Sequence, residues 1–391
     1  MGESEACLNA RASLEDIRSL KRDFEVAYDL VASSGKQDDV EKAQGLKRTL
    51  EAKTKALQET LAIVEAEHLF DLKHQYEEQM AFLKKTGLVE TRKETDASGA
   101  EREVSFMTGI DRKAYPLPSY DTLVLRLAER KELLETKADQ GFVKLLLVPF
   151  GMSLDQMMLR FRAYLLEYKQ GHAAFGRTSP AVADASDEPG WNPLYVWEDG
   201  YKSADTNGTL VYDPISFDAS HTGATKAEVL ARQETEKDTA QGWRVLLLQG
   251  GENGKEFKGI PRGGQGKTEG TKTPRPDIET GTGENLITPR DYLMGQLQGS
   301  GDPGSPYHGE SGMTPEEWIV AFMAELEETG KLMDNYQNGT DSIAYLIGAY
   351  FTASDRVPRA FWDRDDRQAL LFGSDPDRGV EGLGVRSAVR V

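Results

Sequence analysis

The most informative part of the sequence is at the C-terminal end of the chain: AFWDRDDRQAL at residues 360–370, followed by GVRSAVRV at residues 384–391. Residues 355–391 contain seven arginines and seven acidic residues but no lysine. A guanidinium group donates several hydrogen bonds in fixed directions, so arginine without lysine favours ordered contacts inside a folded region. A domain edge held together by salt bridges would produce the same composition.

Upstream of this stretch, apolar runs alternate with amphipathic segments. The runs VKLLLVPFG at residues 143–151 and WRVLLLQ at residues 243–249 predict two buried strands. Apolar residues at helical spacing predict a helix over 154–168. Thr-Pro openings followed by acidic residues predict helices over 289–298 and 314–329. Together these elements indicate an α+β body.

The first 86 residues have a different pattern, which predicts helices packed in pairs. A second apolar stripe, from Leu46 to Leu83, follows a first one, and neither stripe can be buried alone. We therefore expect a helical hairpin or coiled coil over residues 1–86, with a homo-oligomer through these helices as a further outcome. Residues 87–139 are expected to form a polar linker and a helix over 121–138. The first stripe, at three- and four-residue steps, comprises Leu14, Ile17, Leu20, Phe24, Tyr28 and Val31.

The composition excludes several classes of function. The chain has 391 residues and a formal net charge of −18 at pH 7, whereas nucleic-acid binders and proteins on anionic membranes need a basic face. No apolar run approaches the length of a membrane span. We therefore expect neither a nucleic-acid partner nor a membrane partner. The absence of a visible secretory signal predicts a cytoplasmic location, with export by an unrecognised route as the alternative.

The sequence predicts no metal and no cofactor. The single cysteine, Cys7, excludes an internal disulfide framework and a cysteine-based zinc site. The five histidines do not stand at metal-ligand spacings with other ligand types. The segment GGQGKT at residues 263–268 is similar to a phosphate-binding loop, but the residues that follow it cannot form the helix that such a loop requires.

The C-terminal stretch resembles the variable region of proteins that are diversified by retroelements. The resemblance rests on residues 360–370 and 384–391, together with SGMTPEEW at residues 311–318 and IGAYF at residues 347–351. It implies a C-type-lectin-like domain over residues 140–391, a fold shared with formylglycine-generating enzymes, with a variable region at about 355–391. It also implies a non-enzymatic function, the binding of a protein or cell-surface ligand through the variable face.

The same resemblance implies roles for individual residues. In that family, mutagenic reverse transcription replaces adenines, so Asn codons that end in a pyrimidine can come to encode Asp, Leu, Phe, Ser or Gly but not Trp, Gln or Glu. The implied ligand-binding residues are Phe361, Asp363, Asp365, Asp366, Leu370, Phe372, Ser374, Asp375 and Asp377. The implied structural framework consists of Trp362, Arg367 and Arg386.

The apolar residues of this stretch allow two interpretations. Exposed among the acids, they would form an apolar centre with a polar rim, which is the usual composition of a binding surface. Alternatively, the same side chains line a core. The residues concerned are Phe361, Leu370, Leu371 and Phe372.

Two other functions remain open. The related fold also belongs to formylglycine-generating oxidases, but that chemistry needs copper-binding cysteines, and Cys7 is the only cysteine in the chain. Calcium-dependent sugar binding is disfavoured because the Glu-Pro-Asn and Trp-Asn-Asp motifs of sugar-binding lectins are absent. The last hypothesis is a structural adaptor whose helical segment sets an oligomer.

Overall fold

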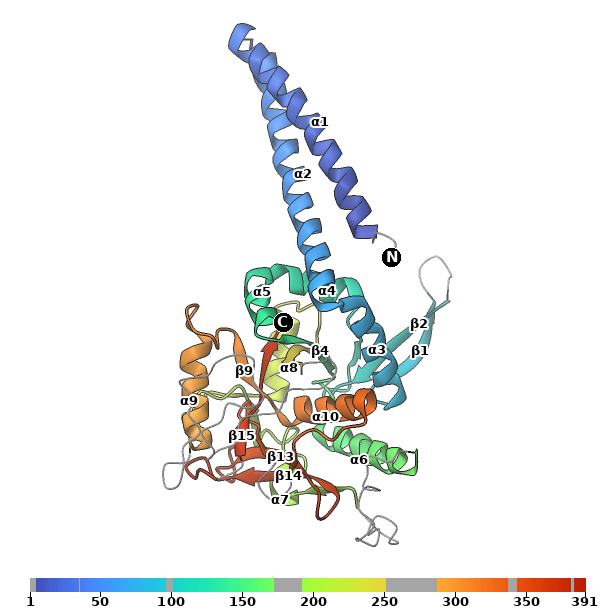
Figure 1. The fold of residues 1–391 in the computed structure, drawn as a ribbon, viewed down its shortest axis with the longest axis vertical. Coiled ribbons are helices and arrows are strands. Elements are labelled where there is room, and N and C mark those ends of the chain that lie inside the picture. The colour runs from blue at the N-terminus through green and yellow to red at the C-terminus, as the bar shows by residue number, and fades with distance from the viewer. Residues whose placement is uncertain are drawn as a thin grey trace.

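The computed structural model describes residues 5–34, 36–95, 101–171, 192–250, 287–336, 343–380 and 383–391. It confirms the α+β class: a helical N-terminal region is followed by a body rich in β-sheet (Figure 1). The phosphate-loop-like segment at residues 263–268 lies outside the described residues.

The expected helical hairpin is present. Helices α1 (Glu5–Ser34) and α2 (Gln37–Phe70) run antiparallel and project from the body as a long pair (Figure 1). The stripe of α1 faces α2 with one exception, because Tyr28 is 62% exposed and its neighbour Ala27 is buried in its place. The three- and four-residue steps of a helical stripe allow either position, so spacing alone cannot decide between them.

The third helix of the N-terminal region, α3 (Leu72–Lys85), belongs to the body. It is separated from α2 by Asp71, whose backbone is left-handed with a φ of 45°. Leu72, Phe82 and Leu83 are buried in the main core. The side-chain amide of Gln75 accepts a hydrogen bond from the backbone N–H of Leu145 at 2.7 Å and donates one to Val143 O at 2.9 Å. The hairpin therefore ends near Phe70.

The segment expected as a polar linker forms a small antiparallel sheet instead. It consists of β1 (Glu90–Thr95), β2 (Glu101–Thr108) and β3 (Ala114–Pro116) in that order. Charged residues on the exposed β1 conceal the alternation that marks a half-buried strand, which explains the wrong prediction. The helix expected over 121–138 is divided at Arg130 into α4 (Tyr120–Glu129) and α5 (Lys131–Asp139).

The central sheet contains both predicted apolar strands. Its order is β4 (Phe142–Val148), β8 (Arg244–Gln249), β16 (Ser387–Arg390) and β9 (Glu310–Gly312), with antiparallel pairing throughout. Leu145, Leu146 and Leu147 are fully buried, as their continuous apolar run predicts. The last strand of the chain thus lies inside the sheet, between β8 and β9.

Helix α10 (Pro315–Thr329) packs against β4 of this sheet, and α6 (Leu154–Gly171) packs against α10. The Thr314 hydroxyl accepts a hydrogen bond from the Glu317 N–H, and the Glu317 carboxylate accepts one from the Thr314 N–H. This capping box and the proline at the first turn fix the start of α10. Residues 315–326 of α10 are all buried, so the helix lies inside the body. The other Thr-Pro opening starts α9 (Pro289–Ser300) in the same way.

A second sheet of six strands carries the C-terminal stretch. Its main order is β15 (Leu383–Val385), β11 (Ile343–Tyr345), β13 (Val357–Asp363), β14 (Gln368–Ser374) and β5 (Leu194–Val196). The short β10 (Asn335–Tyr336) also pairs with β13. A third sheet joins β12 (Ala349–Phe351), β6 (Leu210–Tyr212) and β7 (Ala224–Thr225). Two short helices, α7 (Glu198–Tyr201) and α8 (Lys226–Thr235), follow β5 and β7.

Candidate ligand-binding face

The antiparallel hairpin of β13 and β14 forms the centre of the candidate site. Its register places Arg359 opposite Phe372, Phe361 opposite Leu370 and Asp363 opposite Gln368. Because successive side chains of a strand point to opposite sides, these three pairs share one side of the sheet. Buried residues of both strands, Ala360, Trp362, Ala369 and Leu371, occupy the other side. We call the half-exposed outer side the β13–β14 face.

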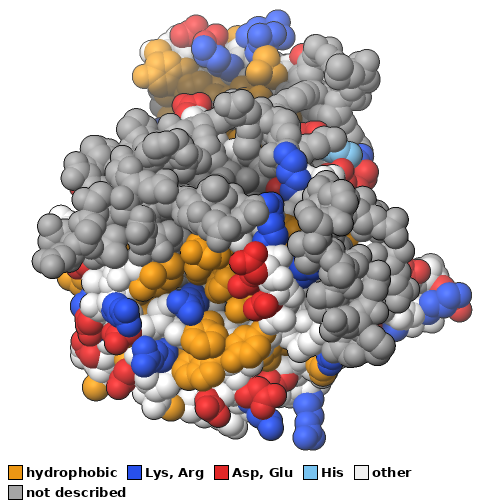
Figure 2. All heavy atoms as spheres, turned by 60° about the horizontal axis from the view of Figure 1, so that its bottom comes forward, with side chains coloured by type: hydrophobic (Ala, Val, Ile, Leu, Met, Phe, Trp, Pro, Cys, Tyr) orange, Lys and Arg blue, Asp and Glu red, His pale blue; other side chains and the backbone are white. Residues whose placement is uncertain are grey.

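Aromatic side chains extend this face across the neighbouring strand β5. The ring of Tyr195, 42% exposed, stacks on Phe372 with centroids 6.0 Å apart. The Trp197 ring also lies near Phe372, with centroids 6.1 Å apart. The guanidinium carbon of Arg359 is 4.9 Å from the centre of the Phe372 ring. Figure 2, which brings this end of the molecule forward, shows hydrophobic side chains gathered among acidic and basic ones. The face thus has an apolar centre and a charged surround.

The turn between β13 and β14 presents two of the predicted acids on a fixed backbone. The Asp363 carboxylate accepts hydrogen bonds from the backbone N–H groups of Asp365 at 2.9 Å and Asp366 at 3.2 Å. Arg367, which closes the turn, is buried and has a left-handed backbone with a φ of 50°. The side chains of Asp365 and Asp366 remain exposed. Such a turn keeps its shape while those side chains are free to contact a ligand.

The remaining predicted acids lie in the loop after β14 and are tied to the protein. The Asp377 carboxylate accepts hydrogen bonds from the Arg290 guanidinium, the shorter at 2.6 Å, which hold the pKa of Asp377 below its ordinary value. The Asp375 carboxylate accepts a bond from the Asp377 N–H at 3.0 Å. Because Arg290 belongs to α9, these contacts attach the loop to that helix.

Two of the predicted ligand-binding side chains, Ser374 and Phe361, are buried, with 6% and 7% of their surface exposed. Phe361 is on the outer side of the sheet, but a second core, to which Tyr292 and Leu293 of α9 belong, covers that part. The predicted position of these two residues at the ligand is therefore wrong. Of the four apolar residues that allowed two interpretations, Phe361 and Leu371 line a core, whereas Leu370 and Phe372 are half-exposed on β14.

The predicted framework residues lie beneath the face. Trp362 stacks on Phe322 of α10, with ring centroids 6.1 Å apart. The Arg386 guanidinium donates to one oxygen of the buried Asp334 carboxylate at 2.7 Å, and the Trp318 indole donates to the other at 2.9 Å. The Trp362 N–H donates to Asp334 O at 3.0 Å. These contacts join β13 to α10 and to the segment at Arg386 that precedes β16.

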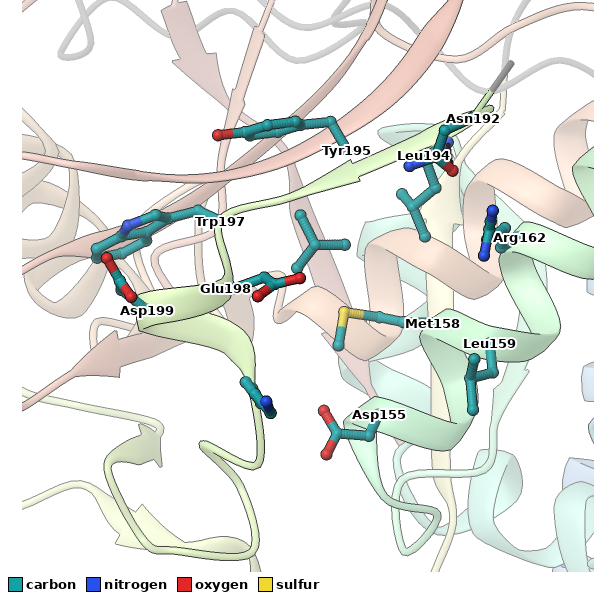
Figure 3. A pocket seen from close by; sticks show the side chains of 12 residues that line it. Asp155, Met158, Leu159, Arg162, Asn192, Leu194, Tyr195, Trp197, Glu198 and Asp199 are labelled. Atoms are coloured by element: carbon teal, nitrogen blue, oxygen red, sulfur yellow. Dashed lines mark hydrogen bonds between the residues drawn. The ribbon is translucent and has the colours of Figure 1, made fainter. Parts of the chain in front are cut away.

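A groove adjoins the face on the far side of β5 (Figure 3). Its cavity volume is about 730 Å³, and it runs between α6 and the segment formed by β5 and α7. Met158, Leu159 and Val196 supply apolar lining. The charged residues around it are Asp155, Glu198, Asp199, Arg162 and Lys202. Asp155 is engaged by Ser203, whose N–H and hydroxyl both donate to it.

The sequence did not identify Tyr195, Trp197 or Arg359 as site residues. Tyr195 and Trp197 precede the C-terminal stretch by about 170 positions, and only the parallel pairing of β5 with β14 brings them to the face. The signal that was available is the run of aromatic residues between positions 195 and 217.

The structure offers no metal centre in the parts of the chain that it describes, where no group of three or more His, Cys, Asp or Glu side chains could hold an ion. Within the same ranges, none of the helices is long and apolar enough to cross a membrane. Comparison with known proteins gives no relative: no family model, no curated protein and no solved structure matches this chain.

Proposed function

We propose that this chain is a non-enzymatic ligand-binding protein whose β13–β14 face is a variable recognition surface on a C-type-lectin-like domain. The observation that carries the proposal is the alternation along β14. Gln368, Leu370 and Phe372 point outward and are half-exposed, whereas Ala369 and Leu371 between them are fully buried. The outward Gln368 and Phe372 belong to neither hydrophobic core and Leu370 lies at the margin of the second one, so these positions can change with little effect on packing, while the inward side chains hold the strand in place.

The turn and the framework add to this argument. The Asp363 carboxylate fixes the turn that displays Asp365 and Asp366. Trp362, one of the implied invariant positions, is buried beneath the face. A binding surface whose backbone is rigid loses little conformational freedom when a ligand binds, whatever side chains it carries.

The topology is compatible with the lectin-like resemblance. The C-terminal strand β16 is paired inside the central sheet, and the SGMTPEEW segment forms the strand β9 and the start of the buried helix α10. The segments on which the resemblance rests therefore all lie in the body, and residues 360–370 form the strands and turn at its surface.

The chemistry of the face favours a ligand with an apolar or aromatic group next to a polar one. Tyr195 and Phe372 offer a stacking surface, and the acids of the turn border it. A buried aromatic anchor at the centre of an interface contributes about 2 kcal/mol or more to binding. The oxidase alternative has no comparable support, because Cys7, the only cysteine, lies in α1.

A selection experiment tests the proposal. The full chain, immobilised, is exposed to a phage-displayed library of random peptides and to a glycan array. We expect the selected ligands to bind at least tenfold more weakly to Leu370→Asp and to Tyr195→Ala. Met294→Asp, a change of a residue on α9 that is 59% exposed, is the control and should keep affinity. Ligands that bind all three variants equally, or no ligand from either source, would contradict the proposal.

A further inference from the structure

We propose that the α1–α2 hairpin docks against the same face of a second copy of the chain, so that two hairpins form a four-helix bundle. This inference does not rest on the proposed function. The docking face is one long side of the hairpin. From α1 it contains Ala12, Asp16, Ser19, Asp23, Val26 and Leu30, and from α2 it contains Asp38, Lys42, Gly45, Thr49, Lys53 and Ala56.

Helix geometry defines this face. Each residue of an α-helix advances by about 100°, so the inward stripes of α1 and α2 leave two sides of the hairpin open. The ion pair between Lys53 and Asp16, 2.8 Å long, crosses the seam on one of these sides. The pair shows that Asp16 of α1 and Lys53 of α2 lie on the same side of the hairpin. This side is the docking face.

The hairpin alone leaves its apolar surface incompletely covered. Val26 is 61% exposed and Leu30 is 45% exposed, and as residues four apart they lie next to each other on α1. Even the inward residues Leu20 and Phe24 are only half-buried. Two helices bury one stripe against each other, and further helices are needed to cover the flanks, as in four-helix bundles.

The shape of the face suits a second copy. Since Asp16 is level with Lys53 and the helices are antiparallel, Val26, ten positions nearer the tip, is level with position 43 of α2. Gly45 is two residues away, about 3 Å along the axis. A Cβ atom placed on Gly45 would meet nothing within 4 Å. A two-fold axis along the hairpin sets α1 of one copy against α2 of the other, so Val26 meets the open space at Gly45 in both directions.

One pair of charges on the face is complementary under the same symmetry. Asp16 and Lys53 already pair within one copy, whereas Asp23 of α1 and Lys42 of α2 have opposite charges and are both exposed. The two-fold axis brings Asp23 of one copy toward Lys42 of the other, and Asp38 of α2 lies near the tip, level with Val31 rather than with Asp23. On the opposite side of the hairpin, pairs within single helices already bring opposite charges together: Lys21 with Glu25 at 4.0 Å, and Lys47 with Glu51 at 3.9 Å.

The size of the face suits a weak dimer that forms at high protein concentration. The face runs from Ala12 to Leu30, about 27 Å along α1, and two helices side by side are about 20 Å wide, which gives about 540 Å² per copy. Stable protein interfaces bury about 800 Å² per partner, and weaker, transient interfaces are smaller. A dimer of this form would carry two β13–β14 faces on one four-helix bundle, and two linked binding faces raise the apparent affinity for a multivalent target.

Size-exclusion chromatography with light scattering on the full chain tests the inference. At protein concentrations rising to about 1 mM we expect the mass to increase from 43.3 kDa toward twice that value. The variant Val26→Glu/Leu30→Glu should have the monomer mass, with helix content unchanged by circular dichroism, because both sites are exposed and Glu favours helices. The matched control is Tyr28→Glu/Ala32→Glu, which adds the same charge at the same spacing on the opposite side and should stay dimeric.

Three results would overturn the inference. The first is a wild type that stays monomeric over the whole concentration range, and the second is a mass corresponding to more than two copies. The third is dissociation of the control variant to the same extent as Val26→Glu/Leu30→Glu, which would show that this side of the hairpin is not the interface.

Discussion

Replacement of Lys226 by methionine probes a fully buried ion-pair cluster of the body. The Lys226 ammonium lies 2.7 Å from an Asp205 oxygen and 2.9 Å from a Glu316 oxygen, and all three side chains are fully buried. It also donates to Met152 O at 2.8 Å, and the Tyr212 hydroxyl donates to Glu316 at 2.6 Å. The cluster joins α8, α10 and β6, so its loss weakens the contacts between them.

The magnitude follows from leaving buried charge without a partner. Removal of one member of a buried ion pair lowers the free energy of unfolding by about 3–5 kcal/mol. Each kcal/mol lowers the Tm of a domain of this size by about 2–4 °C, so we expect a decrease of roughly 6–20 °C at pH 7. Lys73→Met, a change at an exposed site, should shift Tm by no more than about 1–2 °C.

The pH dependence distinguishes this mechanism from simple loss of packing. Burial raises the pKa of Glu316, but Lys226 outweighs burial and holds the pKa below its ordinary value of 4.5. In the native protein this group therefore stabilises the fold above about pH 4.5, and the contribution is lost as pH falls through the lower folded value. Without Lys226, burial raises the pKa, so the deficit relative to the wild type should shrink as pH falls.

Thermal unfolding followed by circular dichroism at pH 7 and pH 5 measures both effects. We expect the gap in Tm between the wild type and Lys226→Met to be smaller at pH 5 than at pH 7. A gap below 2 °C at pH 7, or an equal gap at both values, would refute the argument that Lys226 compensates two buried carboxylates.

Three further predictions concern the face and its support. Arg386→Ala leaves the buried Asp334 carboxylate without its cation, so we expect the free energy of unfolding to fall by about 3 kcal/mol. Urea denaturation followed by tryptophan fluorescence measures this change, and a decrease below about 1 kcal/mol would contradict the framework role of Arg386. Leu371→Ala should cost about 2–5 kcal/mol in the same assay, whereas Leu370→Ala, on the outer side of the same strand, should cost about 1 kcal/mol or less; equal costs would refute the assignment of sides. Burial acts to raise the pKa of Asp213, but Arg244 of β8 and Arg390 of β16 lower it to about 2. The ionised Asp213 carboxylate therefore stabilises the fold above pH 3.8, and this contribution is lost as the pH falls toward 2. An Asp213→Asn variant should show a weaker acid transition in that window, and an unchanged transition would contradict the assignment.

Parts of this fold could be predicted from the sequence because they depend on local pattern. The strands β4 and β8 are uninterrupted apolar runs, and the starts of α9 and α10 are set by a hydroxyl cap and a proline. The hairpin follows from apolar stripes too long to remain uncovered. The sheet β1–β3 was missed because its charged residues follow no clear alternation.

The candidate site depends more on contacts between distant segments. The sequence could place Leu370 and Phe372 in a surface stretch, but not Phe361 beneath the second core, because its cover includes α9. Tyr195 reaches the face only through the pairing of β5 with β14, and the groove forms only where α6 approaches β5. The spacing of residues along the sequence does not show that β5 lies beside β14 and α6, so these contacts could not be predicted from it.

We propose above that side chains of the β13–β14 face vary on a constant framework. Sequencing of the 3′ end of the gene and its flanking DNA in independent isolates measures this variation. We expect substitutions concentrated in the codons of Asp363, Asp365, Asp366, Leu370 and Phe372, unchanged codons for Trp362 and Arg386, and a nearby repeat that differs at adenines. An identical 3′ end in all isolates, or substitutions spread evenly over buried and exposed positions with no repeat, would contradict it.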